Sequence, residues 1–124
     1  MSRFTPVNDE LYEYMVAHGA RQDELLARID RETQELGSLA SMQIGADQGA
    51  FMTLLARAVG ASEALEIGTF MGYSAICIAR GLPPSGRLLC LELSEEYARK
   101  ARDNIAAAGL ADRVEIKVGP ALES

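Results

Sequence analysis

Apolar residues in the first 60 positions recur at helical spacing, and each periodic segment is followed by a glycine. Such a pattern predicts amphipathic helices that end near those glycines. Three segments show it: one from the capping candidates Asn8 or Asp9 to Gly19, one carrying Leu25, Leu26, Ile29 and Leu36 before Gly37, and one from about Asp47 to Gly60. The intervening SLASMQIGA, residues 38–46, is expected to be a loop.

After position 60 the pattern changes to short apolar runs that alternate with helical segments. EALEI (63–67), RLLCLE (87–92) and RVEIKV (113–118) predict strands. The nearly continuous apolar run of 87–92 is typical of a strand covered on both faces. Residues 73–82, and the segment from the capping candidate Ser94 to Gly109, predict helices.

This order of elements defines the expected architecture. Strand–helix–strand–helix–strand is the right-handed half of a doubly wound, Rossmann-like sheet, all parallel with strand order 3-2-1. We therefore expect an α/β fold forming one domain over residues 1–124. Within it, residues 1–60 would be a helical segment and residues 61–124 a βαβαβ unit.

Charge and composition exclude several classes of protein. The chain has 12 Lys and Arg against 18 Asp and Glu, a net charge of −6, and no basic cluster that would bind a phosphate backbone. No apolar run approaches the roughly 20 residues that span a bilayer, and the polar MSRFTPVNDE start is unlike a signal peptide. Cys77 and Cys90 lie in apolar segments without metal-binding spacing, so buried thiols are favoured over a disulfide. We expect a cytoplasmic protein that binds neither nucleic acid nor membrane.

The turn after the first predicted strand, EIGTFMGYS, carries the clearest candidate chemistry. Gly68 and Gly72 would let a ligand approach the backbone closely, and the following helix would offer free N–H groups and a hydroxyl at Ser74. Glu92 ends the neighbouring strand, about 4.8 Å away across the sheet, and can accept both hydroxyls of a ribose. Together these residues predict a ligand that contains a nucleoside.

Charge and the glycine pattern favour one class of nucleoside-containing ligand over another. GTFMGYS lacks the G-x-G-x-x-G pattern of dinucleotide sites, and Glu66 at the turn would repel a pyrophosphate. S-adenosylmethionine carries a sulfonium and an ammonium with a single carboxylate, and fits this charge better than NAD. The structural alternative is that the glycines only pack the helix on the strand and that Glu92 is a solvated strand end.

Residues 40–124 resemble the cation-dependent, S-adenosylmethionine-dependent O-methyltransferases of the caffeoyl-CoA and catechol type. The motifs that carry the resemblance occur in order: EIGTFMGYSA, LCLELS, AGLADRVE and GPALES. The resemblance implies methyl transfer to a hydroxyl of a small, catechol-like acceptor. It places the methionine end of the cofactor on Met42, Ile44, Glu66, Gly68, Thr69, Phe70 and Ser74. It places the ribose on Glu92 and the adenine on Leu93, Gly119, Pro120 and Ala121.

The resemblance also implies what these residues lack. In this family a divalent metal such as Mg²⁺ sits on acids after the fourth and fifth strands, so we expect no catalytic or metal-ligating residue here. Either the chain is a fragment of a longer enzyme, which we favour, or it is a catalytically incomplete module that binds S-adenosylmethionine. A dehydrogenase half-domain ranks last. The first strand would lack a neighbour on one side, and we expect a homodimer through that edge or through the N-terminal helices.

Overall fold

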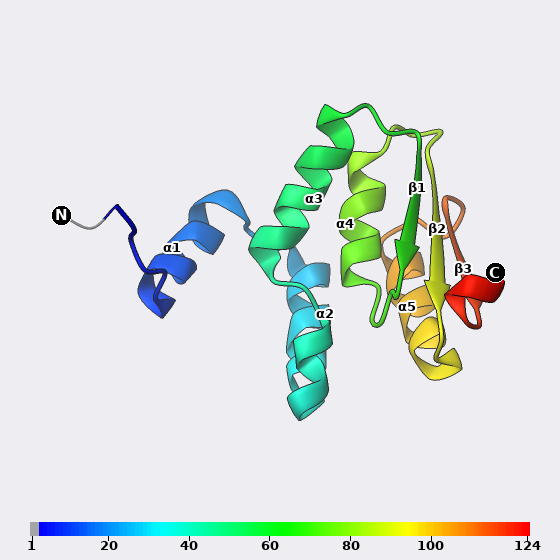
Figure 1. The fold of residues 1–124 in the computed structure, drawn as a ribbon, viewed down its shortest axis with the longest axis horizontal. Coiled ribbons are helices and arrows are strands. Elements are labelled where there is room, and N and C mark those ends of the chain that lie inside the picture. Colours follow the sequence, from blue (N-terminus) through cyan, green and yellow to red (C-terminus); the bar gives the residue numbers. More distant parts are fainter. Residues whose placement is uncertain (1–2) are drawn as a thin grey trace.

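The computed structural model describes residues 3–124 and shows helices followed by a small parallel sheet (Figure 1). The first elements are the helices α1 (Asp9–Gly19), α2 (Glu24–Gln34), the 3₁₀ helix η1 (Gly37–Met42) and α3 (Ala46–Ala58). The remaining ones are β1 (Glu63–Ile67), α4 (Tyr73–Gly81), β2 (Arg87–Glu92), α5 (Glu95–Ala107), β3 (Val114–Val118) and the 3₁₀ helix η2 (Ala121–Glu123). The predicted α/β architecture is therefore confirmed.

The three strands form one parallel sheet in the order β1-β2-β3, which confirms the predicted 3-2-1 order. Glu66 of β1 lies opposite Cys90 of β2, which lies opposite Ile116 of β3. Glu92 pairs with Val118 at the last position of β2. Since parallel strands end at the same edge of a sheet, Glu66 and Glu92 come close to one another there.

The core lies between the sheet and the helices on one of its faces (Figure 1). Leu88, Cys90 and Ile116 are buried on this face, together with Ile76 of α4 and Ile105 of α5. These side chains explain why α4 and α5 pack here, because each helix presents its apolar stripe to the sheet.

The opposite face of the sheet is open along β1. Leu65 and Ile67 of β1 point away from the covered face and keep 59% and 71% of their surface exposed. Leu89 of β2, beside Leu65, is only half-buried. Leu91, the next β2 residue on this face, is buried with 7% of its surface exposed. The expectation that 87–92 would be covered on both faces therefore holds at Leu91 and fails at Leu89 within residues 3–124.

Helix starts agree well with the sequence, whereas the region around residue 37 does not. The side chains of Asn8 and Ser94 accept hydrogen bonds from the N–H groups of Leu11 and Tyr97, as capping residues do. Helix α2 ends at Gln34 because its last turn tightens, and residues 37–42 form η1 where a loop was expected.

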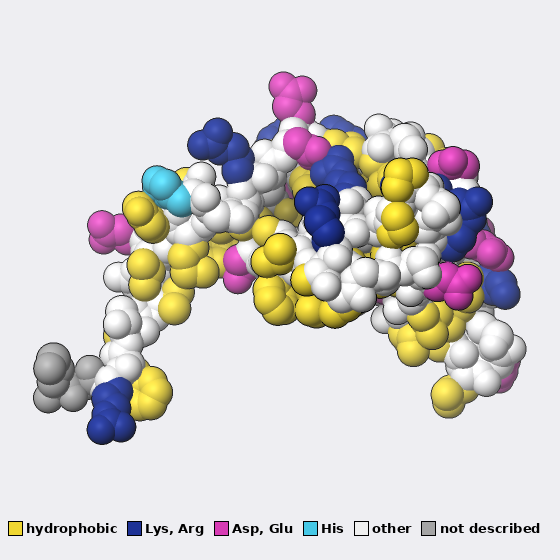
Figure 2. Space-filling model, turned by 90° about the horizontal axis from the view of Figure 1, so that it is seen from above, with side chains coloured by type: hydrophobic (Ala, Val, Ile, Leu, Met, Phe, Trp, Pro, Cys, Tyr) yellow, Lys and Arg dark blue, Asp and Glu magenta, His cyan; other side chains and the backbone are white. Residues whose placement is uncertain are grey.

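Exposed apolar side chains lie on α1, on α3 and on β1, among other elements. Figure 2 shows apolar side chains gathered along one side of the molecule. The exposed apolar residues of α3 and β1 are Phe51, Leu54, Leu55, Leu65 and Ile67, and Val59 follows directly after α3. None of the helices in residues 3–124 combines the length and the apolar character needed to cross a bilayer.

Candidate functional site

A pocket of about 220 Å³ lies at the carboxyl end of β1, between the glycine turn and the segment that follows η1. This is the edge at which open α/β sheets bind their ligands. Its lining residues are Met42, Gln43, Ile44, Met52, Glu66, Ile67, Gly68, Thr69, Phe70, Met71, Tyr73 and Ser74. Pockets for whole ligands usually measure about 300–1,000 Å³, so this one has room for part of a larger molecule.

The turn itself adopts a conformation that ordinary residues avoid. Gly68 and Gly72 have φ angles of 82° and 84°, in the left-handed region. Phe70, between them, has a φ of 49°, which costs a non-glycine residue about 1–3 kcal/mol. A Cβ atom on Gly72 would lie 3.2 Å from Cα of Ala101 in α5, so glycine is needed here for space as well.

Glu92 holds this turn through its side chain. Its Oε2 accepts hydrogen bonds from the N–H groups of Thr69 at 3.0 Å and Phe70 at 2.8 Å, and its Oε1 accepts one from Ser94 at 3.0 Å. The side chain is buried, with 7% of its surface exposed. A carboxylate offers about four acceptor positions, so one remains for a ligand hydroxyl, and not the two that the sequence led us to expect for a ribose.

Glu66 is the second buried acid of the site, with 9% of its surface exposed. It accepts hydrogen bonds from the hydroxyl of Ser74 and the thiol of Cys90. None of the ion pairs within residues 3–124 involves Glu66. Burial raises the pKa of this carboxyl, hydrogen bonds from Ser74 and its neighbours lower it in part, and the charge of Glu92 raises it further.

The hydroxyl of Thr69 is buried in the same place. It makes no hydrogen bond within normal distance and angle limits, although it lies near enough to Glu66 to lower the pKa of that acid. A buried hydroxyl without a partner is available to a ligand group or a water.

The structure brings the residues predicted for the methionine end together in this pocket. Met42 and Ile44 lie on one wall and Glu66, Gly68, Thr69, Phe70 and Ser74 on the other. Glu92 lies behind the turn and does not line the pocket.

The residues predicted for the adenine lie beyond Glu92, outside the pocket. Leu93 has 73% of its surface exposed, and Gly119 donates its N–H to the carbonyl oxygen of Glu92 at 2.9 Å. Pro120 and Ala121 follow at the start of η2. The four residues thus sit at the ends of β2 and β3, and their contact with adenine stays a prediction.

Several lining residues were not predicted from the sequence. The hydroxyl of Tyr73 accepts a hydrogen bond from Gln22 at 2.8 Å, and burial raises the pKa of Tyr73 to about 12, so it stays protonated. Its position directly before Ser74 in the sequence could have identified Tyr73 as a residue of the site. Met52 and Gln43 reach the pocket only through the packing of α3 and the turn after η1, for which no local signal exists.

The described residues do not fit a metal site. Within residues 3–124, no three His, Cys, Asp or Glu side chains come close enough together to hold an ion. Cys77 and Cys90 are both buried free thiols, as the sequence predicted.

Comparison with known proteins assigns the family. The sequence model of a family described as O-methyltransferase matches residues 16–124. The chain belongs to this O-methyltransferase family. It is 47% identical over 90 residues to a catechol O-methyltransferase from Mycobacterium tuberculosis, covering 73% of this chain and 41% of the relative. It is 33% identical over 117 residues to caffeoyl-CoA O-methyltransferase 2 from Petunia hybrida, covering 93% and 48%.

Solved structures agree with this assignment. The O-methyltransferase TomG from Streptomyces achromogenes, solved with S-adenosylmethionine, superimposes with a TM-score of 0.85 at 39% identity, over 92% of this chain and 51% of that one. An O-methyltransferase from Bacillus cereus, solved with S-adenosylhomocysteine, gives 0.82 at 40% identity, over 90% and 50%. The resemblance to catechol and caffeoyl-CoA O-methyltransferases is thus confirmed, and the chain spans about half the length of these relatives.

Proposed function

We propose that the chain forms the cofactor-binding part of an S-adenosylmethionine-dependent O-methyltransferase. The observation that carries the proposal is the pair of buried acids, Glu66 and Glu92, at the ends of neighbouring strands on either side of the glycine turn. Glu66 has no cationic partner among residues 3–124. Glu92 has one acceptor position left for a hydroxyl. The bound S-adenosylmethionine and S-adenosylhomocysteine of the Streptomyces and Bacillus proteins support it.

Each part of the site has a proposed role. Glu66 balances the cationic groups at the methionine end of the cofactor. The hydroxyls of Ser74 and Thr69 contact the same end of the cofactor. Glu92 accepts from the ribose, while Leu93 and residues 119–121 contact the adenine. Bound in this way, S-adenosylmethionine supplies an activated methyl group on its sulfonium, and the residues here orient the molecule for transfer.

The methyl acceptor and the metal are part of the same proposal, but none of the residues named above is proposed to bind them. We propose a small, catechol-like acceptor whose hydroxyl is methylated with the help of a divalent metal such as Mg²⁺. The names of the Mycobacterium and Petunia relatives support this class of acceptor. Hard cations need oxygen ligands, and residues 3–124 assemble no such cluster, so the metal's ligands would come from elsewhere in the protein.

Assembly and location complete the proposal. We propose a homodimer, because β1 is an edge strand whose Leu65 and Ile67 are exposed, and because Phe51, Leu54 and Leu55 of α3 are exposed in the single chain. We also propose a cytoplasmic location, where the two buried thiols stay reduced, and no nucleic-acid partner, given the net charge of −6.

Calorimetric titration with S-adenosylmethionine, S-adenosylhomocysteine and NAD tests cofactor binding. We expect the first two to bind and NAD not to bind. Methyl transfer from labelled S-adenosylmethionine to catechol and to a caffeoyl thioester, with Mg²⁺ and with a chelator, then tests the activity of the protein that carries these residues. Binding without any transfer would favour the alternative of a catalytically incomplete module.

A further inference from the structure

We propose that Asn104, held by Arg28, is a positioning residue that fixes the glycine turn in its binding conformation. The proposal rests on the proposed function, because it concerns the same cofactor site. Neither residue lines the pocket, so both would act on the cofactor through the backbone of the turn.

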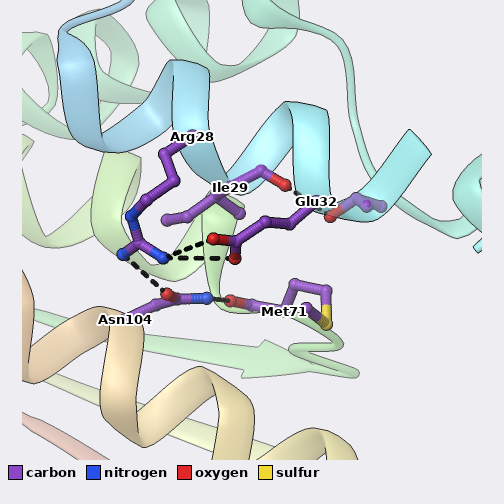
Figure 3. Close-up of polar contacts among 6 residues, drawn as sticks. Arg28, Ile29, Glu32, Met71 and Asn104 are labelled. Atoms are coloured by element: carbon purple, nitrogen blue, oxygen red, sulfur yellow. Dashed lines mark hydrogen bonds and ion pairs between the residues drawn. The ribbon is translucent and has the colours of Figure 1, made fainter. Parts of the chain in front are cut away.

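Asn104 connects α5 to the turn from within the core. With 5% of its surface exposed, its Nδ2 donates a hydrogen bond to the carbonyl oxygen of Met71 at 2.9 Å (Figure 3). Its Oδ1 accepts a hydrogen bond from Nη2 of Arg28 at 3.2 Å (Figure 3). Because both ends of the buried amide are used, its orientation is fixed, with the donor towards the turn.

The carbonyl of Met71 lies at the centre of the strained part of the turn. Its neighbours Phe70 and Gly72 both have positive φ angles, 49° and 84°. On the other side, the N–H groups of Thr69 and Phe70 donate to Glu92. The turn is thus held between Asn104 and Glu92, and its conformation determines where both the pocket wall and the ribose-binding acid lie.

Arg28 links helix α2, which lies in the N-terminal segment, to Asn104 and so to the turn. Its Nη1 donates to both carboxylate oxygens of Glu32, at 2.9 Å and 3.1 Å, and its Nη2 points to Asn104. The side chains of Arg28 and Glu32 are 41% and 46% exposed, and ion pairs this exposed add little to stability. The main contribution of Arg28 is therefore to orient the Asn104 amide, and not to stabilise the fold through its ion pair.

The same helix also holds the opposite wall of the pocket. The Thr33 hydroxyl of α2 lies 2.9 Å from Oε1 of Gln43 and 2.8 Å from the carbonyl oxygen of Ile29, and its single hydrogen is shared between these two acceptors. Nε2 of Gln43 donates to Asp30 of α2 at 2.9 Å. Gln43 lies between Met42 and Ile44 on that wall. Helix α2 therefore contacts both sides of the pocket, one through Gln43 and the other through Arg28 and Asn104.

Three variants test the role: Arg28→Met, Asn104→Leu and the double variant. Two readouts are needed: the Kd for S-adenosylmethionine by calorimetry, and the exchange rates of the Thr69 and Phe70 amides by NMR without cofactor. We expect Asn104→Leu to raise the Kd about tenfold, the effect of one lost hydrogen bond, and Arg28→Met to raise it less. The double variant should match Asn104→Leu, because Arg28 acts through Asn104. Both amides should exchange faster in the variants.

Arg113→Met is the matched control. Arg113 also links separate elements: it donates to the carbonyl oxygens of Pro83 at 2.8 Å and Ala79 at 3.4 Å, and neither of these acceptors belongs to the turn. We expect it to lower the melting temperature without changing the Kd or the two amide exchange rates.

The outcomes separate this proposal from the proposed function. If the unaltered protein does not bind S-adenosylmethionine, the proposed function fails, and amide exchange still tests the role of Asn104. If Arg28→Met leaves both the Kd and the exchange rates unchanged, the positioning role is overturned, even where Asn104→Leu fails to fold. Equal effects of Arg28→Met and Arg113→Met would also overturn it, since they would show a loss of general stability.

Discussion

Binding of S-adenosylmethionine should release a proton from Glu66, and Glu66→Gln should abolish that release. The Gln side chain keeps the size of Glu66 and can still accept from Ser74, but it carries no charge. Burial raises the pKa of Glu66 above its ordinary value of 4.5, so the free protein keeps this proton to a higher pH than an exposed Glu does. A ligand with cationic groups favours the carboxylate, and binding therefore shifts the acid towards its charged form.

The size of the effect follows from the contacts. A hydrogen bond to a charged group contributes about 1.5–3 kcal/mol, so Glu66→Gln should raise the Kd by about 10- to 150-fold at neutral pH. As the pH falls through the raised pKa, log Kd of the unaltered protein should rise by at most about one per pH unit, since one proton is involved. The Kd of the variant should not follow this slope.

Rising pH should strengthen cofactor binding but lower the free energy of unfolding of the cofactor-free protein. A carboxyl whose pKa is raised by folding favours the folded state while it is protonated. The free energy of unfolding should therefore fall as the pH rises from the ordinary pKa of 4.5 through the raised value. The Glu66→Gln variant has no charge to bury, so its free energy of unfolding should not fall in this way. Without cofactor, the variant should be more stable than the unaltered protein at pH values above the raised pKa.

Calorimetry in two buffers of different ionisation enthalpy measures the released proton directly. Glu63→Gln is the matched control, because Glu63 is an exposed acid on the same strand and should not affect binding. Binding heats that are identical in both buffers across the acidic range, with parallel pH profiles for the unaltered protein and Glu66→Gln, would refute the reasoning.

Three further predictions concern the ribose acid, the sheet edge and the thiols. Glu92→Ala should weaken cofactor binding by about 1.5–3 kcal/mol in calorimetry, and an unchanged affinity would rule out Glu92 as the ribose ligand. Light scattering should show a dimer of the 124-residue chain that Leu65→Lys together with Ile67→Lys converts to a monomer, whereas a monomer before substitution would contradict the proposed interface. Burial raises the pKa of Cys77 to about 11 and of Cys90 to about 12, so both thiols should resist iodoacetamide at mildly alkaline pH until denaturant is added. Rapid alkylation of the folded protein would show that this part of the core opens readily.

Local chemistry explains which parts of the fold were predictable. Capping by Asn8 and Ser94 depends on a side chain and an N–H group three residues away, so the sequence marks both helix starts. The turn was likewise predictable from Gly68 and Gly72, because their positive φ angles restrict the residue type at those positions. The parallel order followed from the handedness of strand–helix–strand connections.

Packing between distant segments explains what was missed. The apolar run of β2 predicted two covered faces, but whether a face is covered depends on other elements, and α4 and α5 lie on only one. Helix η1 has no apolar period, and its placement depends on the tightened end of α2. The pairing of Arg28 with Asn104 joins residues 76 positions apart, and in the sequence each appears only as a polar position on a helix.

Glu92 shows why a residue predicted as a ligand can also be part of the framework of its own site. Three backbone N–H groups already donate to its carboxylate, two of them from the turn that forms the neighbouring pocket wall. The left-handed conformation of Phe70 is unfavourable by itself, and hydrogen bonds to charged groups are strong enough to offset such a cost. The turn is therefore organised before any ligand arrives, and a ribose hydroxyl would meet an acid whose position is already fixed. It follows that the affinity of this site depends on the supports of the turn as well as on the groups that touch the ligand.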